Sequence, residues 1–158
     1  MLLAAVGLVV VLYAQPAEAN YPGKPAKIAF SGFDGNDYEI YTINAGGGGK
    51  VNVTNNDTGD YDPAYSPSGK RIAYTNFATG TDTEIYTINP DGGGRLNVTD
   101  NGTSDYYPYY SPSGKKIAYV YDATGTDAEI YTINPGGGGR QPVTDNGTND
   151  YDPYRGRQ

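Results

Sequence analysis

Residues 66–110 read SPSGKRIAYTNFATGTDTEIYTINPDGGGRLNVTDNGTSDYYPYY, and residues 111–155 repeat them with 34 of the 45 positions identical. Part of a further copy precedes them, because the EIYTIN of residues 84–89 and 129–134 also occurs at residues 39–44. A period of about 45 residues is typical of the blades of a β-propeller, in which each unit packs on the next. The repeat therefore decides the fold class.

Each copy has the pattern of four short strands separated by turns. In the second copy we expect strands at residues 60–65, 70–76, 83–89 and 95–99, with SPSG, NPDGGG and DNGT as turns. The central strands do not alternate cleanly between apolar and polar residues, which indicates that both faces of each sheet are covered. Stacked sheets meet that need. The sequence thus predicts an all-β chain of three four-stranded antiparallel β-propeller blades.

A family resemblance supports this prediction. The sequence DPAYSPSGKRIAY at residues 62–74, followed by EIY at 84–86 and VT at 98–99, resembles the PD40 (WD40-like) repeat of the TolB-like propellers over about residues 27–154. The resemblance implies a propeller that binds protein partners at the cell envelope. Two positions depart from the family pattern, with Tyr in place of the usual Trp and Ser in place of the usual Asp (Tyr65, Tyr110, Ser68 and Ser113).

The N-terminus has the features of an export signal. The first 14 residues are almost wholly apolar, and AEA follows at residues 17–19. This run is short for a membrane-spanning helix, which needs about 20 residues, and it favours a signal peptide. We expect a signal peptide at residues 1–19, a linker at 20–26, propeller repeats at 27–154 and a tail at 155–158. Cleavage would give a periplasmic or secreted chain without a membrane span; the alternative is an N-terminal membrane anchor.

The composition excludes several kinds of chemistry. The chain has no His and no Cys, which rules out Ser-His-Asp and Cys-His triads, His/Cys zinc sites and disulfides. A net charge of −7 argues against a nucleic-acid partner. Carboxylate pairs such as Asp60 and Asp62 are explained more simply as turn residues than as glycosidase groups. We expect a binding module without catalytic activity; the alternative is a fragment of a propeller that accompanies a hydrolase domain.

The charges separate between the two edges of the predicted sheets. Successive loops of an antiparallel meander alternate between these edges, and the repeat places almost all carboxylates at one of them and the basic residues at the other. We predict that this acidic edge recruits a basic protein partner; the simpler alternative is that the charges only solvate turns. The residues proposed for binding are Asp57, Asp60, Asp82, Asp100, Asp105, Asp127, Asp145 and Asp150.

Two further features of this edge carry binding hypotheses. Residues 100–105 and 145–150 are rich in oxygen ligands, which suit Ca²⁺, although Asp-Asn-Gly is also a common turn and no other cofactor is indicated. Tyrosines gather on the first strand of each copy, where they either pack between blades or form an aromatic rim for a peptide or a sugar. The rim residues are Tyr61, Tyr106, Tyr107 and Tyr151.

The blade count raises the question of assembly. Closed propellers have about 4 to 8 blades, whereas three copies are present here. The first copy begins at its second strand (residues 27–33), and residues 150–154 resemble a first strand. Two chains in a homodimer would therefore complete each other's first blade in a six-bladed ring. The alternatives are a fragment of a longer propeller and an open monomer.

Overall fold

The computed structural model describes residues 27–77, 82–123 and 126–153. The predicted signal peptide (1–19), linker (20–26) and tail (155–158) lie outside the described residues. Within those residues every regular element is a β-strand, and no helix has the length and apolar character needed to cross a membrane. The all-β prediction is confirmed.

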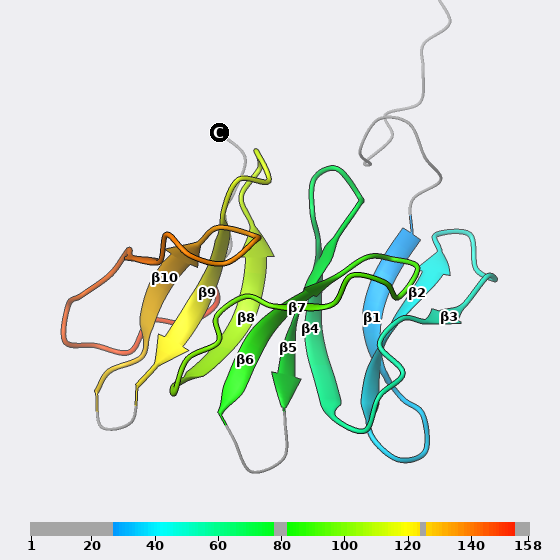
Figure 1. Cartoon of the computed structure of the whole chain (residues 1–158), viewed down its shortest axis with the longest axis horizontal. Coiled ribbons are helices and arrows are strands. Elements are labelled where there is room, and N and C mark those ends of the chain that lie inside the picture. The colour runs from blue at the N-terminus through cyan, green and yellow to red at the C-terminus, as the bar shows by residue number, and fades with distance from the viewer. Residues whose placement is uncertain (1–26, 78–81, 124–125, 154–158) are drawn as a thin grey trace, which may run out of the picture.

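The strands form three antiparallel sheets that follow one another along the chain (Figure 1). The first sheet contains β1 (Lys27–Phe33), β2 (Tyr38–Asn44) and β3 (Val51–Asn52). The second contains β4 (Gly59–Tyr65), β5 (Ile72–Phe77), β6 (Thr83–Ile88) and β7 (Leu96–Asn97). The third contains β8 (Ser104–Tyr110), β9 (Ile117–Asp122), β10 (Glu129–Ile133) and β11 (Gln141–Pro142).

Each sheet is a meander of neighbouring strands, as the repeat predicts. The second and third sheets have the four strands expected of a propeller blade. The first has three among the described residues, because the described chain enters the sheet at β1, the second strand of a copy. Residues 150–153 form no strand, and Tyr154 lies outside the described residues.

Apolar side chains cover both faces of the middle sheet. On one face, Ile72 and Tyr74 of β5 pack with Ile40 of the first sheet. On the other face, Ala73 of β5 packs with Ile117 and Tyr119 of the third sheet. Successive residues of β5 therefore serve two different cores, which explains why the strand does not alternate between apolar and polar residues.

The last strand of each sheet is shorter than the pattern predicts. Residues 95–99 were expected to pair throughout, but β7 covers only Leu96 and Asn97. Val98 N still donates to the carbonyl of Ile85 over 2.8 Å, whereas Ile85 N donates to the Thr99 hydroxyl over 3.0 Å. The Thr99 side chain thus replaces the backbone acceptor and ends the ladder.

Candidate functional site

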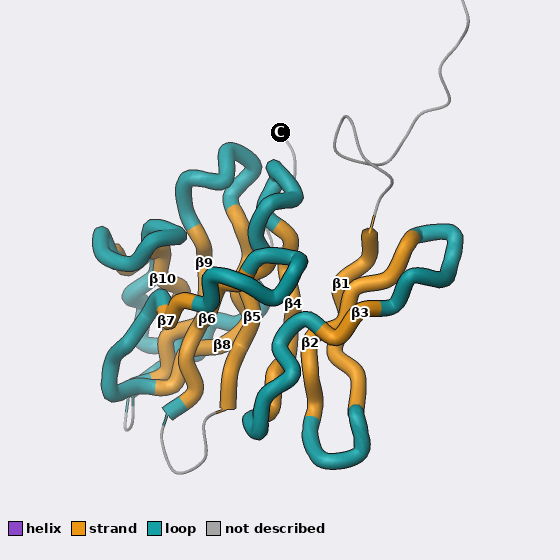
Figure 2. The backbone as a smooth tube through the Cα atoms, turned by 45° about the vertical axis from the view of Figure 1, so that its right-hand side comes forward, coloured by secondary structure: helices purple, strands orange, loops and turns teal. Residues whose placement is uncertain are grey.

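The loops gather at two opposite edges of the stack. In Figure 2 the loop between β1 and β2 lies at the lower end of the strands, and the loop between β2 and β3 lies at the upper end. The antiparallel order repeats this arrangement in the other sheets. The predicted separation of acidic and basic residues therefore follows from the observed topology.

The acidic edge divides into exposed and buried carboxylates. Asp60 and Asp105 are fully buried, and Asp150 is partly exposed. Burial corrects the prediction for Asp60 and Asp105, because these side chains cannot reach a partner at the surface. The members that are exposed, and so remain candidates for contact with a partner, are Asp57, Asp82, Asp100, Asp127 and Asp145.

The buried carboxylates hold the loops of this edge in place. The Thr99 hydroxyl donates to the Glu84 carboxylate, and Asn101 N donates to its other oxygen over 2.8 Å. The Asn101 side-chain amide then donates to Asp105 Oδ2 over 2.7 Å. The same bonds recur in the other two copies, around Glu39 and around Glu129. This repeated network sets the loop shape.

The two buried aspartates, Asp60 and Asp105, differ in one hydrogen-bond partner. Asp60 Oδ1 accepts a 2.6 Å hydrogen bond from the amide of Asn76. The corresponding residue in the next copy is Tyr121, which pairs with Asp105 across β8 and β9. Asp105 Oδ1 is consequently buried without a hydrogen-bond partner among the described residues. Burial raises the pKa of Asp105 to about 7, against the opposing effect of the hydrogen bond from Asn101.

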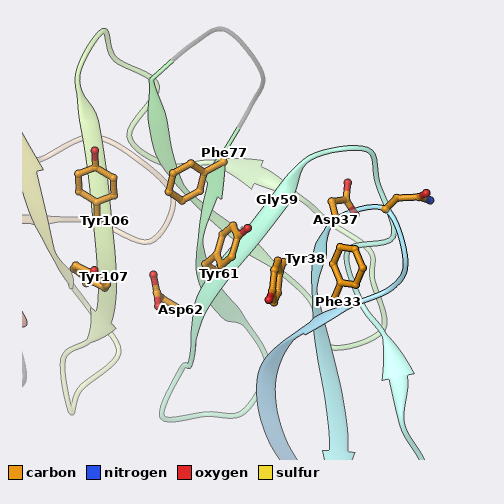
Figure 3. A pocket seen from close by; sticks show the side chains of 10 residues that line it. Phe33, Asp37, Tyr38, Gly59, Tyr61, Asp62, Phe77, Tyr106 and Tyr107 are labelled. Carbon is orange, nitrogen blue, oxygen red and sulfur yellow. The ribbon is translucent and has the colours of Figure 1, made fainter.

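An aromatic strip runs along the acidic edge across all three sheets. It consists of Phe33, Tyr38, Tyr61, Phe77, Tyr106 and Tyr107, and neighbouring ring centroids are 5.1–6.4 Å apart. The rings line a hollow of about 610 Å³ together with Asp37 and Asp62 (Figure 3). The predicted rim residues Tyr61, Tyr106 and Tyr107 are brought together there. Tyr151 is exposed and does not line the hollow.

Sequence reasoning missed three members of this strip. Phe33 and Phe77 end β1 and β5, and Tyr38 begins β2. The signal was present, because Phe33 and Phe77 occupy the same place in successive copies. Both are large exposed apolar side chains. The strip is therefore an aromatic surface that lies outside both hydrophobic cores.

The hollow contains a strained backbone position that recurs in each copy. Asp62, Tyr107 and Asp152 have φ of 53°, 53° and 54°. In the second and third sheets this residue lies within a β-bulge between the first two strands. Asp tolerates the left-handed conformation, whereas a bulky Tyr there is a genuine outlier. Tyr107 thus carries strain at a position that faces the hollow, as is common at binding sites.

Three carboxylates in the described part of the chain lie close enough together to be considered as metal ligands. Asp34, Asp37 and Glu39 bring three oxygens within 4.8 Å of one another in the described part of the chain. Both Glu39 oxygens already accept hydrogen bonds, from Thr54 and Asn56. Asp34 accepts from two backbone amides, the first cause of its lowered pKa. A Ca²⁺ ion needs six to eight oxygen ligands, so these three carboxylates would supply only part of its coordination.

Comparisons with known proteins agree with this architecture. The family described as PD40, the TolB beta propeller domain, matches residues 19–156. No curated protein matches the chain. The structure of a putative TolB from Agrobacterium tumefaciens is similar, with a TM-score of 0.67 and 24% identity over 75% of this chain and 45% of that one. TolB from Acinetobacter baumannii gives a TM-score of 0.67 and 24% identity over 79% of this chain and 31% of that one.

A weaker similarity links the chain to an enzyme. An oligogalacturonate lyase in complex with manganese gives a TM-score of 0.56 and 20% identity over 68% of this chain and 30% of that one. All three similarities demonstrate a shared fold. The chain spans less than half the length of each TolB structure.

Proposed function

Because the chain belongs to the PD40 TolB β-propeller family, we propose that it is an exported, non-catalytic propeller module that binds a basic protein partner at the cell envelope. One observation carries this proposal. Exposed carboxylates and an exposed aromatic strip share one edge of the stack, whereas the loop-building carboxylates Glu39, Asp60, Glu84 and Asp105 are buried beneath it. Charge attracts the partner, and the rings provide area that is desolvated on contact.

We expect no catalysis at this edge. Catalytic acids need an accessible carboxyl with a matched pKa. Asp105, the carboxyl with a pKa of about 7, is fully buried. The exposed Asp57 and Asp82 lie in loops and serve in this proposal as contact groups. The similarity to a lyase is a similarity of fold, and it assigns no reaction to this chain.

We also propose that the acidic edge works without a bound metal. The segments suggested for Ca²⁺, residues 100–105 and 145–150, use their side chains within the loop network. Asp105 Oδ2 and Asp150 Oδ2 each accept a bond from the Asn four residues earlier. Releasing these oxygens for Ca²⁺ would break the bonds that shape the loop.

Export and homodimerisation complete the proposal. Export rests on the signal-peptide pattern at residues 1–19. For the dimer, β1 has a free outer edge among the described residues, and Asp150 N donates to the carbonyl of Ala128 over 2.7 Å at the start of the segment that would pair with β1 of a second copy. Light scattering tests the dimer. A folded monomer at micromolar concentration would contradict it.

The test of the main proposal compares two sets of variants. Wild-type protein is immobilised and exposed to envelope extract, beside a variant in which Asp57, Asp82 and Asp127 are replaced with Asn. A matched control replaces Lys70 and Lys115, exposed at the opposite edge, with Gln. We expect the acidic-edge variant to lose the captured protein and the control to keep it. Equal capture by all three, or binding to a glycan array instead, would overturn the proposal.

A further inference from the structure

We propose that the hollow lined by the aromatic strip binds an arginine side chain from an extended basic segment of the partner. This inference rests on the proposed function and assigns the acidic edge a specific pocket. Figure 3 shows Asp62 between Tyr107 and Tyr61 in this view, with Phe77 and Tyr106 beside them. The hollow therefore presents a carboxylate among aromatic rings.

The aromatic rings leave enough free surface for a ligand to stack on them. Phe33 is 59% exposed, Phe77 44%, Tyr38 42% and Tyr107 39%. A guanidinium group is planar and weakly hydrated, so it stacks on aromatic faces more readily than an ammonium group does. The basic residues of this chain already use the same contact at the other edge, where the Arg95 guanidinium lies 4.3 Å from the ring centre of Tyr86.

The polar groups of the hollow accept hydrogen bonds and carry negative charge. Asp62 lines it. Burial raises the pKa of Asp62, the hydrogen bond with Thr75 opposes this rise, and the negative charge of Asp152 adds to it. Asp37 Oδ1 is buried and has no hydrogen-bond partner among the described residues. A ligand that only donates hydrogen bonds and carries positive charge suits these acceptors, and arginine has five such donors.

Tyr107 determines what enters the hollow. The corresponding residue is Asp in the other two copies, Asp62 and Asp152, and all three precede a proline. An aromatic ring at a left-handed position is disfavoured, and its backbone N is held by a 3.3 Å bond to the Thr75 hydroxyl of the neighbouring sheet. Tyr107 thus places a ring beside Asp62 in the lining of the hollow, where a guanidinium group can stack on the ring and bond the carboxylate.

A neutral sugar is the main competing ligand, because sugars also bind to aromatic rings and carboxylates. The electrostatic field of the exposed carboxylates on the same edge attracts a cation but does not attract an uncharged sugar. The rings of the strip are also tilted against one another by 35–77°. They enclose a side chain better than they form a flat platform for a sugar.

The probe is a fluorescein-labelled peptide, Gly-Ser-Arg-Gly-Arg-Ser-Gly, measured by fluorescence anisotropy against the full chain. Matched peptides carry Lys or the uncharged isostere citrulline in place of Arg. We expect citrulline to weaken binding by about tenfold or more and Lys to weaken it by about threefold. Equal affinity for the citrulline peptide, or displacement of the Arg peptide by maltohexaose at lower concentration than by arginine amide, would overturn the inference.

Three variants locate the site. Tyr107→Asn removes the ring but suits the left-handed backbone, so the fold is retained, and we expect the affinity to fall by about tenfold. Tyr107→Phe keeps the ring and should bind within about twofold of wild type. A double Asp82→Asn, Asp127→Asn variant lowers the charge outside the hollow. If that variant weakens binding and Tyr107→Asn does not, the acidic edge remains the docking surface and the arginine pocket is wrong. If no variant has an effect, both proposals fail.

Discussion

Replacing Asp105 with Asn should stabilise the fold at alkaline pH. Asp105 is fully buried and its Oδ1 has no hydrogen-bond partner among the described residues, so burial raises its pKa from 3.8 to about 7. Because the folded state holds this proton more tightly than the unfolded state, the stability that the proton contributes is fully present below about pH 4, where both states are protonated. Stability then falls as the pH rises toward 7.

The change in pKa sets the size of the effect. A rise from 3.8 to about 7 corresponds to at most about 4 kcal/mol of unfolding free energy lost between acid and neutral pH. Asn removes this charge cost but leaves a buried amide N–H without a partner, which costs about 1–3 kcal/mol. The net gain at pH 8 should therefore be about 2 kcal/mol, with Asn101 still donating to the retained side-chain oxygen.

Urea denaturation followed by tyrosine fluorescence, from pH 4 to pH 8, measures this effect. The matched control is Asp60→Asn, in which both carboxylate oxygens already accept bonds, from Asn56 and Asn76. An amide at position 60 would turn an N–H toward one of these donors, so we expect a loss of about 2 kcal/mol at pH 8. The reasoning is refuted if Asp105→Asn keeps the pH dependence of the wild type, or if both variants shift stability in the same direction.

Three further predictions concern the loop network, the metal and export. Thr99→Val removes the hydroxyl that bonds Glu84 and Ile85 N, and should lower the unfolding free energy by about 2 kcal/mol in chemical denaturation, whereas Thr99→Ser should retain most of it. Millimolar Ca²⁺ should leave the melting temperature unchanged, because a ligand stabilises only by binding the folded state; a rise would restore the calcium hypothesis. Intact-mass measurement of protein from the native host should give a chain that begins at Asn20, and a membrane-bound chain retaining residues 1–19 would indicate an anchor.

Local sequence determined the architecture of this protein. The repeat of turn residues and short apolar stretches predicted the strands within a few residues, since turn chemistry and strand pairing between neighbours depend on local sequence. The meander then determined which loops share an edge. For example, Ile72, Ala73 and Tyr74 indicate a strand covered on both faces, and the structure places these residues in two different cores.

Tertiary structure decided which acidic residues are surface and which are interior. Asp57 and Asp60 lie in the same loop region of the sequence, yet Asp57 is exposed and Asp60 is fully buried. The difference arises because Asp60 lies within β4, beneath the loop, whereas Asp57 lies in the loop itself; Asn76 on the neighbouring strand then bonds the buried Asp60 carboxylate. In the next copy Tyr121 occupies that position, and Asp105 Oδ1 has no hydrogen-bond partner in the described part of the chain.

The aromatic strip was likewise determined only in three dimensions. Phe33 and Tyr38 belong to the first sheet, Tyr61 and Phe77 to the second, and Tyr107 to the third. Side chains so far apart in the chain meet because the sheets stack, with β4 against β1 and β2 of the first sheet and β8 against β4 and β5 of the second. A repeat pattern specifies each blade by itself, whereas the surface shared by three blades depends on how the sheets pack against one another.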